Sequence, residues 1–223
     1  NSGSGFITID PNAAETVDGA TTLVLMPGDA ILLECDGSNW KSMARYRPAV
    51  GSYKVVGNDS KNNAATPNTQ FDLDADQVVL FSPSDGTTVV RDNPGAITNN
   101  ISTAGPAANG RDQAGAFSAS SWIYFYWIWN GSTLATISSA TAPSTGPALP
   151  TGYTHWALCT SARLDGGTLL LKIRVKGALV SYELQQNVLT NGTATVEATV
   201  SLSTVVPPNA LTVNVEADLD ISS

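Results

Sequence analysis

Residues 121–132 constrain the fold more than any other part of the chain. They read Ser-Trp-Ile-Tyr-Phe-Tyr-Trp-Ile-Trp-Asn-Gly-Ser and hold six aromatic residues, although only 7% of the whole sequence is aromatic. Side chains alternate between the two faces of a strand. The two predicted faces are Trp122, Tyr124, Tyr126 and Ile128 on one side, and Ile123, Phe125, Trp127 and Trp129 on the other. The second face is the more apolar and is predicted to be core, whereas the tyrosine hydroxyls of the first suit an interface or a wet surface.

The residues that follow this run indicate a hairpin. Asn130-Gly131 is a strong two-residue turn signal, and residues 133–138 are predicted to pair back onto the aromatic strand. A strand that is apolar on both faces lies either at the centre of a sandwich or beneath another subunit. Two-sided core packing is the preferred interpretation, and burial by a second chain is the alternative.

The composition limits the classes of fold and function. Only 13% of the 223 residues are charged, which argues against long solvent-exposed helices. The formal net charge of −8 excludes nucleic-acid binding through a basic patch. No apolar run in the sequence is long enough to cross a bilayer, so we expect no membrane insertion.

Short alternating runs separated by turn residues recur at a spacing of roughly ten residues, which is typical of a sandwich or jelly roll. The first runs, at 6–10, 22–26 and 30–35, form a meander too small to bury its own core. Later strands are predicted at 77–81, 87–91, 122–129, 133–138, 155–159, 168–175, 179–183, 195–200 and 211–217. Irregular loops are predicted at 92–115 and 142–150.

These patterns predict an all-β fold in three parts. A small N-terminal β-meander module covers residues 1–45, a linker rich in Asn and Ala covers 46–70, and a jelly-roll-like β-sandwich domain covers 71–223. The undersized module and the doubly apolar strand both call for further burial, so the sequence predicts an intertwined homotrimer.

Nothing in the sequence predicts a catalytic or metal site. His155 is the single histidine and has no nucleophile motif near it, so a structural or surface role is the preferred interpretation. The five glutamates show no spacing that would pair two carboxylates for glycoside hydrolysis. Cys35 and Cys159 lie far apart in apolar contexts and are predicted to be free, buried thiols. We therefore expect no cofactor.

One acidic run resembles the start of a calcium-binding loop. Asp72, Asp74 and Asp76 have the alternating spacing, but Gln77 stands where the loop needs glycine. The preferred interpretation places the three carboxylates on the wet face of a strand entry. A calcium site completed by a distant residue such as Asp218 or Asp220 stays open as the alternative.

Surface recognition remains as the best-supported chemistry, because sugars stack on aromatic rings and bind amide and carboxylate groups. The aromatic candidates are Trp122, Tyr124, Tyr126, Tyr153 and Trp156. The polar candidates on the adjoining loop are Asn109, Arg111, Asp112 and Gln113. The alternative is that most of these residues are core or trimer contacts.

The N-terminal pattern resembles a short β-module of bacteriophage tail-fibre and tailspike-like proteins. The stretches that carry this resemblance are Ile7-Thr-Ile-Asp-Pro11, Glu15-Thr-Val-Asp-Gly19, Leu25-Met-Pro-Gly-Asp29 and Cys35-Asp-Gly-Ser-Asn-Trp40. Residues 83–86, 107–117, 122–129 and 149–156 are similar to distal domains of such virion proteins.

The resemblance implies a homotrimeric, β-rich fibre component that folds in the host cytoplasm and is exposed on the virion. Its implied partners are other virion proteins and a glycan or protein of the host cell surface. A tail fibre that binds without cutting is the preferred function. A purely structural head fibre or decoration protein and a polysaccharide depolymerase are the alternatives.

Overall fold

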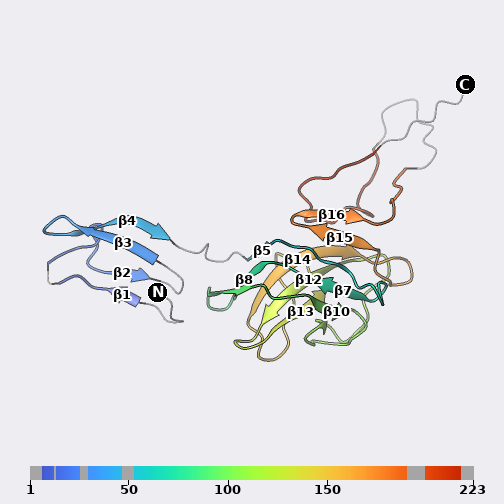
Figure 1. The fold of residues 1–223 in the computed structure, drawn as a ribbon, viewed down its shortest axis with the longest axis horizontal. Helices are drawn as coiled ribbons and strands as arrows, with labels where there is room; N and C mark the ends of the chain where they lie inside the picture. Colours follow the sequence, from blue (N-terminus) through green and yellow to red (C-terminus); the bar gives the residue numbers. More distant parts are fainter. Residues whose placement is uncertain (1–6, 13, 26–29, 47–52, 190–198, 217–223) are drawn as a thin grey trace, which may run out of the picture.

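The computed structural model describes residues 7–12, 14–25, 30–46, 53–189 and 199–216. This described part is all-β: it contains sixteen strands in several sheets and no helix (Figure 1). The strands are β1 (Ile7–Ile9), β2 (Leu23–Leu25), β3 (Ala30–Cys35), β4 (Trp40–Tyr46), β5 (Lys54–Val56), β6 (Lys61–Asn62), β7 (Gln70–Leu73), β8 (Gln77–Phe81), β9 (Thr88–Asp92), β10 (Ile97–Asn100), β11 (Gly110–Arg111), β12 (Trp122–Trp129), β13 (Leu134–Ser139), β14 (His155–Arg163), β15 (Ile173–Lys176) and β16 (Leu179–Tyr182).

The first four strands form two antiparallel pairs, β1 with β2 and β3 with β4. Val17 joins them through bridges to Ala20 and Trp40 and is only 1% exposed. Leu32 and Met43, in contrast, are 63% and 60% exposed. The predicted meander is therefore wrong among the described residues, because the strands form two separate pairs. This small unit also leaves large apolar side chains in solvent, as expected for a unit of its size.

The remaining strands form two larger sheets. The five-stranded sheet has the order β10-β7-β6-β15-β16, and the seven-stranded sheet has the order β11-β13-β12-β14-β8-β5 with β9 paired to β8. All pairings in the two sheets are antiparallel except that of β11 with β13. Both sheets combine segments that lie far apart in the sequence.

The two sheets share one hydrophobic core. Phe71 on β7 and Phe125 on β12 stack with their ring centroids 4.6 Å apart and their planes at 14°. The other large buried residues of this core are Leu73, Val78, Leu80, Ile101, Phe117, Ile123, Trp127, Trp129, Leu164, Leu170, Ile173 and Val175. The predicted alternation along β12 is confirmed, because Ile123, Phe125, Trp127 and Trp129 all enter this cluster.

The opposite face of β12 is buried as well. Tyr124, Tyr126 and Ile128 join a second cluster with Ile137 and Trp156. The preferred interpretation of two-sided packing therefore holds within a single chain. The hairpin signal is also confirmed, because β12 and β13 pair around a turn in which the Asn130 side chain accepts hydrogen bonds from backbone amides.

Several local predictions were wrong. The predicted linker contains β5 and β6, which belong to the two large sheets, so 46–70 is not simply a linker. The predicted irregular loop at 92–115 contains β10 and β11. The strand predicted at 168–175 begins only at Ile173.

At the C-terminal end, residues 211–216 form no strand, although their sequence alternates. The strand predicted at 195–200 falls almost entirely outside the described residues, as do Asp218 and Asp220. Both cysteines are free, but Cys35 is exposed on β3 rather than buried.

Candidate functional site

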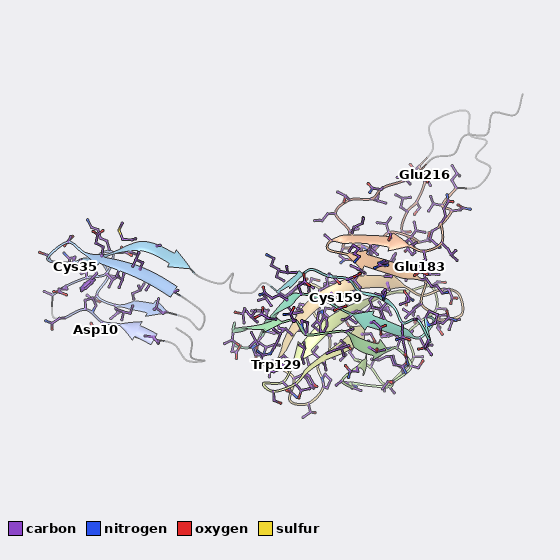
Figure 2. The ribbon with its side chains drawn as sticks, in the orientation of Figure 1. Asp10, Cys35, Trp129, Cys159, Glu183 and Glu216 are labelled. Atoms are coloured by element: carbon purple, nitrogen blue, oxygen red, sulfur yellow. The ribbon has the colours of Figure 1, made fainter. Side chains whose placement is uncertain are left out.

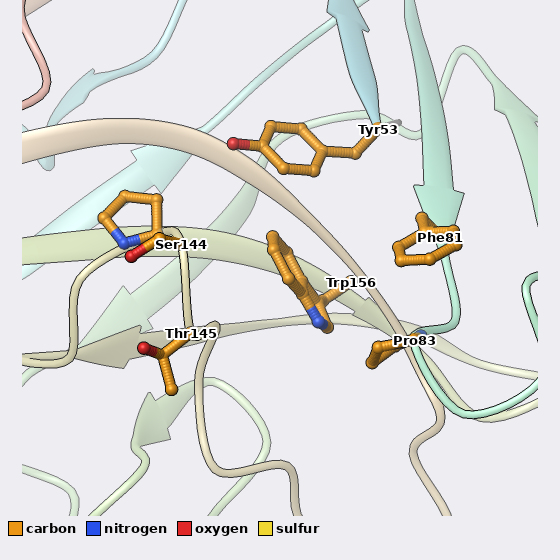
Figure 3. A pocket seen from close by; sticks show the side chains of 7 residues that line it. Tyr53, Phe81, Pro83, Ser144, Thr145 and Trp156 are labelled. Atoms are coloured by element: carbon orange, nitrogen blue, oxygen red, sulfur yellow. The ribbon is translucent and has the colours of Figure 1, made fainter. Parts of the chain in front are cut away.

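A pocket of about 380 Å³ opens beside the indole of Trp156, at the start of β14 (Figure 3). Its walls are aromatic rings, prolines and hydroxyl-bearing side chains, and none of them is charged. The lining residues are Tyr53, Phe81, Pro83, Pro143, Ser144, Thr145 and Trp156. They come from the entry to β5, the end of β8, the loop after β13 and β14, so the two-sheet scaffold assembles the pocket from distant segments.

The indole of Trp156 is held in place by neighbouring rings. Tyr126 approaches it edge-on, with centroids 5.5 Å apart and planes at 89°, and Tyr53 lies tilted at 5.0 Å. On a third side the chain passes so close at Gly146 that an added Cβ would lie 2.8 Å from the indole. Gly146 also has φ of +80°, a conformation that favours glycine. Trp156 is thus only 7% exposed, with a fixed ring beside the pocket.

A chain of hydrogen bonds holds the turn that carries Pro83. The Thr87 hydroxyl donates to Asp85 Oδ1 at 2.7 Å and lies 2.9 Å from His155 Nε2. Because that hydroxyl proton is already used, His155 donates from Nε2, and its Nδ1 accepts from the Thr154 hydroxyl at 2.8 Å. Both ring nitrogens of His155 are therefore engaged in positioning the pocket rim.

The charges of this rim follow from its surroundings. Burial lowers the pKa of His155, and Arg91 acts in the same direction while Asp85 opposes it. Hydrogen bonds from Thr87 lower the pKa of Asp85. At neutral pH the imidazole is neutral and the carboxylate is charged, which is the state that this hydrogen-bond chain requires.

The sequence-predicted aromatic residues divide between the pocket and its support. Trp156 lines the pocket, whereas Tyr124 and Tyr126 are 4% and 0% exposed and belong to the cluster beneath it. Tyr153 packs against the same cluster. Trp122 lies at the other end of β12, where its Nε1 donates to a backbone carbonyl. Of the five predicted aromatics, one therefore presents a ring to the pocket.

The predicted polar residues are bonded within the fold instead of converging on the pocket. Asn109 accepts from Thr136, and the buried guanidinium of Arg111 donates to the backbone carbonyls of residues 101 and 114. The Gln113 amide donates to nearby carbonyls of its own loop. Asp112 Oδ2 accepts from the Ala148 backbone amide at 3.2 Å, which ties this loop to the segment that carries the pocket wall.

The sequence reasoning missed most of the pocket walls. Tyr53 lies within the predicted linker, and Phe81 and Pro83 have the pattern of an ordinary strand end and turn. The one available signal was the proline-rich loop at 142–150, which contributes Pro143. The strand pairing of Trp156 with Phe81 then brings these walls together.

Acidic groups are scattered elsewhere. Among the described residues, no group of three or more His, Cys, Asp or Glu side chains has an arrangement that could hold a metal ion. Asp72 lies on the outer face of β7 and accepts hydrogen bonds from Asn63 and Thr98. A second pocket of about 340 Å³ lies among the first four strands next to Trp40, whose Nε1 donates to Glu15.

No protein-family model, no curated protein and no solved structure matches this chain. Within the described residues, no helix is long and apolar enough to span a membrane.

Proposed function

We propose that this chain is a component of a bacteriophage virion fibre that attaches to the host cell surface by binding a glycan without cutting it. In this proposal the two large sheets are a jelly-roll-like β-sandwich and three copies of the chain assemble together. The resemblance of the N-terminal stretches to tail-fibre and tailspike-like modules supports the virion assignment.

The observation that carries the binding proposal is the uncharged aromatic pocket at Trp156. The apolar faces of sugar rings stack on indole and phenol rings, and hydroxyl groups such as those of Ser144 and Thr145 can bond to sugar hydroxyls. The pocket is at the small end of ligand sites, which run from roughly 300 to 1,000 Å³. Each site is therefore expected to be weak, and three linked sites would bind by avidity.

The charges favour a neutral glycan. None of the seven lining residues is charged, and the nearby Asp85 is an anion. The chain as a whole has a net charge of −8. An acidic sugar would find no cation in the pocket and would be repelled at longer range, so a neutral hexose is the ligand class that fits best.

A purely structural head-fibre or decoration role is the second candidate. The observation that favours it is the burial of Tyr124, Tyr126 and Arg111, which shows that many of the sequence-predicted binding residues serve packing. Adsorption of the protein to host cells separates the two functions. Release of reducing sugars from host polysaccharide would instead support a depolymerase.

Replacement of Ser144 by arginine tests the pocket without disturbing the core. Ser144 is exposed and lines the pocket, so a long charged side chain there should occupy it. We expect Ser144→Arg to weaken binding to cells or to a neutral-glycan array at least about tenfold, which is about 1.4 kcal/mol. The matched control is Ala142→Arg, which adds the same charge at an exposed position of the same loop.

Both variants should melt within a few degrees of the unchanged protein, because neither position is buried. Equal binding by the two variants would contradict the pocket assignment. A wild-type protein that binds neither cells nor glycans would contradict the attachment function, and the structural head-fibre or decoration role would be the remaining candidate.

A further inference from the structure

The five-stranded sheet ends in an unpaired edge at β16. Within the described residues, β16 pairs with β15 alone. Leu179 and Val180 are 59% and 42% exposed on this edge strand. Tyr182 lies opposite the core residue Ile173, so one face of β16 continues the core layer out to the free edge. An apolar strand edge of this kind is a template for a further strand.

The same chain carries an unpaired segment with a strand pattern. In residues 211–216, aliphatic side chains alternate with polar ones, which is the pattern of a half-buried strand. In the structure, however, Leu211, Val213 and Val215 are 99%, 46% and 67% exposed, and the segment is not in any strand. Figure 2 shows Glu216 clear of the sheets, beyond β16. Among the residues that the structure describes, this apolar face therefore stays largely exposed.

The chain just before this segment is fixed to the sheets. The Trp122 indole donates to the Ser203 carbonyl at 3.1 Å, and the Tyr182 hydroxyl donates to the Val205 carbonyl at 2.8 Å. These bonds hold Ser203 and Val205, which precede the segment, next to β12 and β16. Residues 211–216 consequently extend from a defined position on the molecule.

We propose that residues 211–216 of one copy add as a strand to the β16 edge of a second copy. Backbone hydrogen bonds would satisfy the free edge, and the aliphatic face of the segment would cover Val180 and Tyr182. In the described part of each copy, the β16 edge and the segment 211–216 are both unpaired and do not pair with each other. The contact joins two different surfaces, the β16 edge of one copy and the segment 211–216 of the next. Every edge and every segment has a partner when the copies close into a ring.

A second copy is the occupant because this chain carries both halves of the contact, the β16 edge and the exposed segment 211–216. The inference rests on the multi-subunit assembly of the proposed function and assigns its contact surface. It does not depend on the pocket at Trp156.

Charge placed on the aliphatic face of the segment tests this contact. We expect the unchanged full chain to assemble in light scattering, and Val213→Lys/Val215→Lys to give the 23.1 kDa single-chain mass. The matched control, Thr212→Lys/Asn214→Lys, adds the same charge to the polar face and should stay assembled. Because all four positions are exposed, the melting profile of each dissociated chain should show a folded protein.

Crosslinking gives an independent test in the full-length chain. A tagged Val180→Cys chain and an untagged Val213→Cys chain, both also Cys35→Ser, are co-expressed and oxidised. We expect a disulfide-linked pair of one tagged and one untagged chain. A chain that carries both new cysteines and closes the disulfide within itself overturns the proposal.

The remaining outcomes separate this inference from the proposed function. A monomeric wild-type chain, or full assembly of Val213→Lys/Val215→Lys, overturns the interface even if Ser144→Arg abolishes glycan binding. Dissociation by the lysines in a protein that binds no cell surface supports the interface and overturns the attachment function.

Discussion

The two cysteines show how strongly the surroundings of one residue type can differ within this chain. Cys35 ends β3 in solvent, with its sulfur 3.4 Å from the Gly37 amide. Cys159 is the extra residue at the irregularity of β14, between the partners of Phe125 and Tyr126, and its sulfur lies 3.2 Å from the Ser60 hydroxyl. Burial raises the pKa of the Cys159 thiol to about 11, although its hydrogen bond with the Ser60 side chain opposes this effect. The Cys159 thiol is therefore protonated at neutral pH.

Alkylation without reductant should distinguish these thiols. At pH 8 the Cys159 thiolate is a minor species, and the reagent must also reach a buried sulfur, so we expect rapid modification of Cys35 alone. Mass spectrometry of the intact chain checks this, with two modified cysteines expected after unfolding in denaturant. The rate at Cys159 should increase as pH rises toward 11. Equally fast modification of both sites in the folded protein would contradict the buried thiol.

Single residues of the candidate site were only partly predictable. Trp156 could be named from the sequence because an aromatic residue beside a proline-rich loop is a visible local signal. Tyr53, Phe81 and Pro143 could not be grouped with it, because the pairing of β5 and β14 with β8 brings them together. The tyrosine hydroxyls indicated an interface or a wet surface for the face that carries Tyr126, yet Tyr126 is 0% exposed and its hydroxyl donates to the Thr141 carbonyl.

At the scale of the elements, β12 determines much of the architecture. It pairs with β13 on one side and β14 on the other, and both of its faces are buried. Its inner face meets the five-stranded sheet through the stacked rings of Phe71 and Phe125. The contact between the two sheets therefore depends on large side chains that are 0% exposed.

Truncation of Phe71 should test this contact. We expect Phe71→Ala to reduce the free energy of unfolding by about 3–5 kcal/mol, because it removes a fully buried ring and leaves a cavity between the sheets. Val90→Ala is the control, since Val90 is 48% exposed on β9, and it should change stability by about 0.5 kcal/mol or less. Denaturant unfolding at a fixed protein concentration measures both. Similar losses for the two variants would argue against a shared core.

The elements with strong local patterns could be predicted, and the others could not. The alternation of β12 and the turn residues after it are visible in the sequence. The short strands β6 and β10 are largely polar, and their place in the sheet comes from distant contacts. Asn62, for example, donates to the Pro67 carbonyl and accepts from the Ile173 amide, so its side chain is part of the sheet's bonding. No local pattern predicts such a contact.

At the scale of the whole molecule, exposed apolar residues gather toward the C-terminal part. Most of the large hydrophobic side chains that are exposed lie between residues 179 and 215. Burial against further copies would remove this apolar surface from water.

Assembly should therefore be measurable as both mass and stability. Light scattering in dilute native solution should give about three times the 23.1 kDa chain mass. Because association stabilises the folded chain by mass action, the melting temperature should rise with protein concentration. A monomer whose melting temperature is independent of concentration would contradict the fibre assembly.

The position of the pocket walls has an evolutionary consequence. Four residues of the pocket wall lie outside the strands, in the segments that connect them: Pro83, Pro143, Ser144 and Thr145. The indole of Trp156, in contrast, is carried by β14. Substitutions in these connections can reshape the pocket without disturbing the strand pairing that keeps the chain folded. Variants of this chain could therefore differ in the shape of the pocket while keeping the same scaffold.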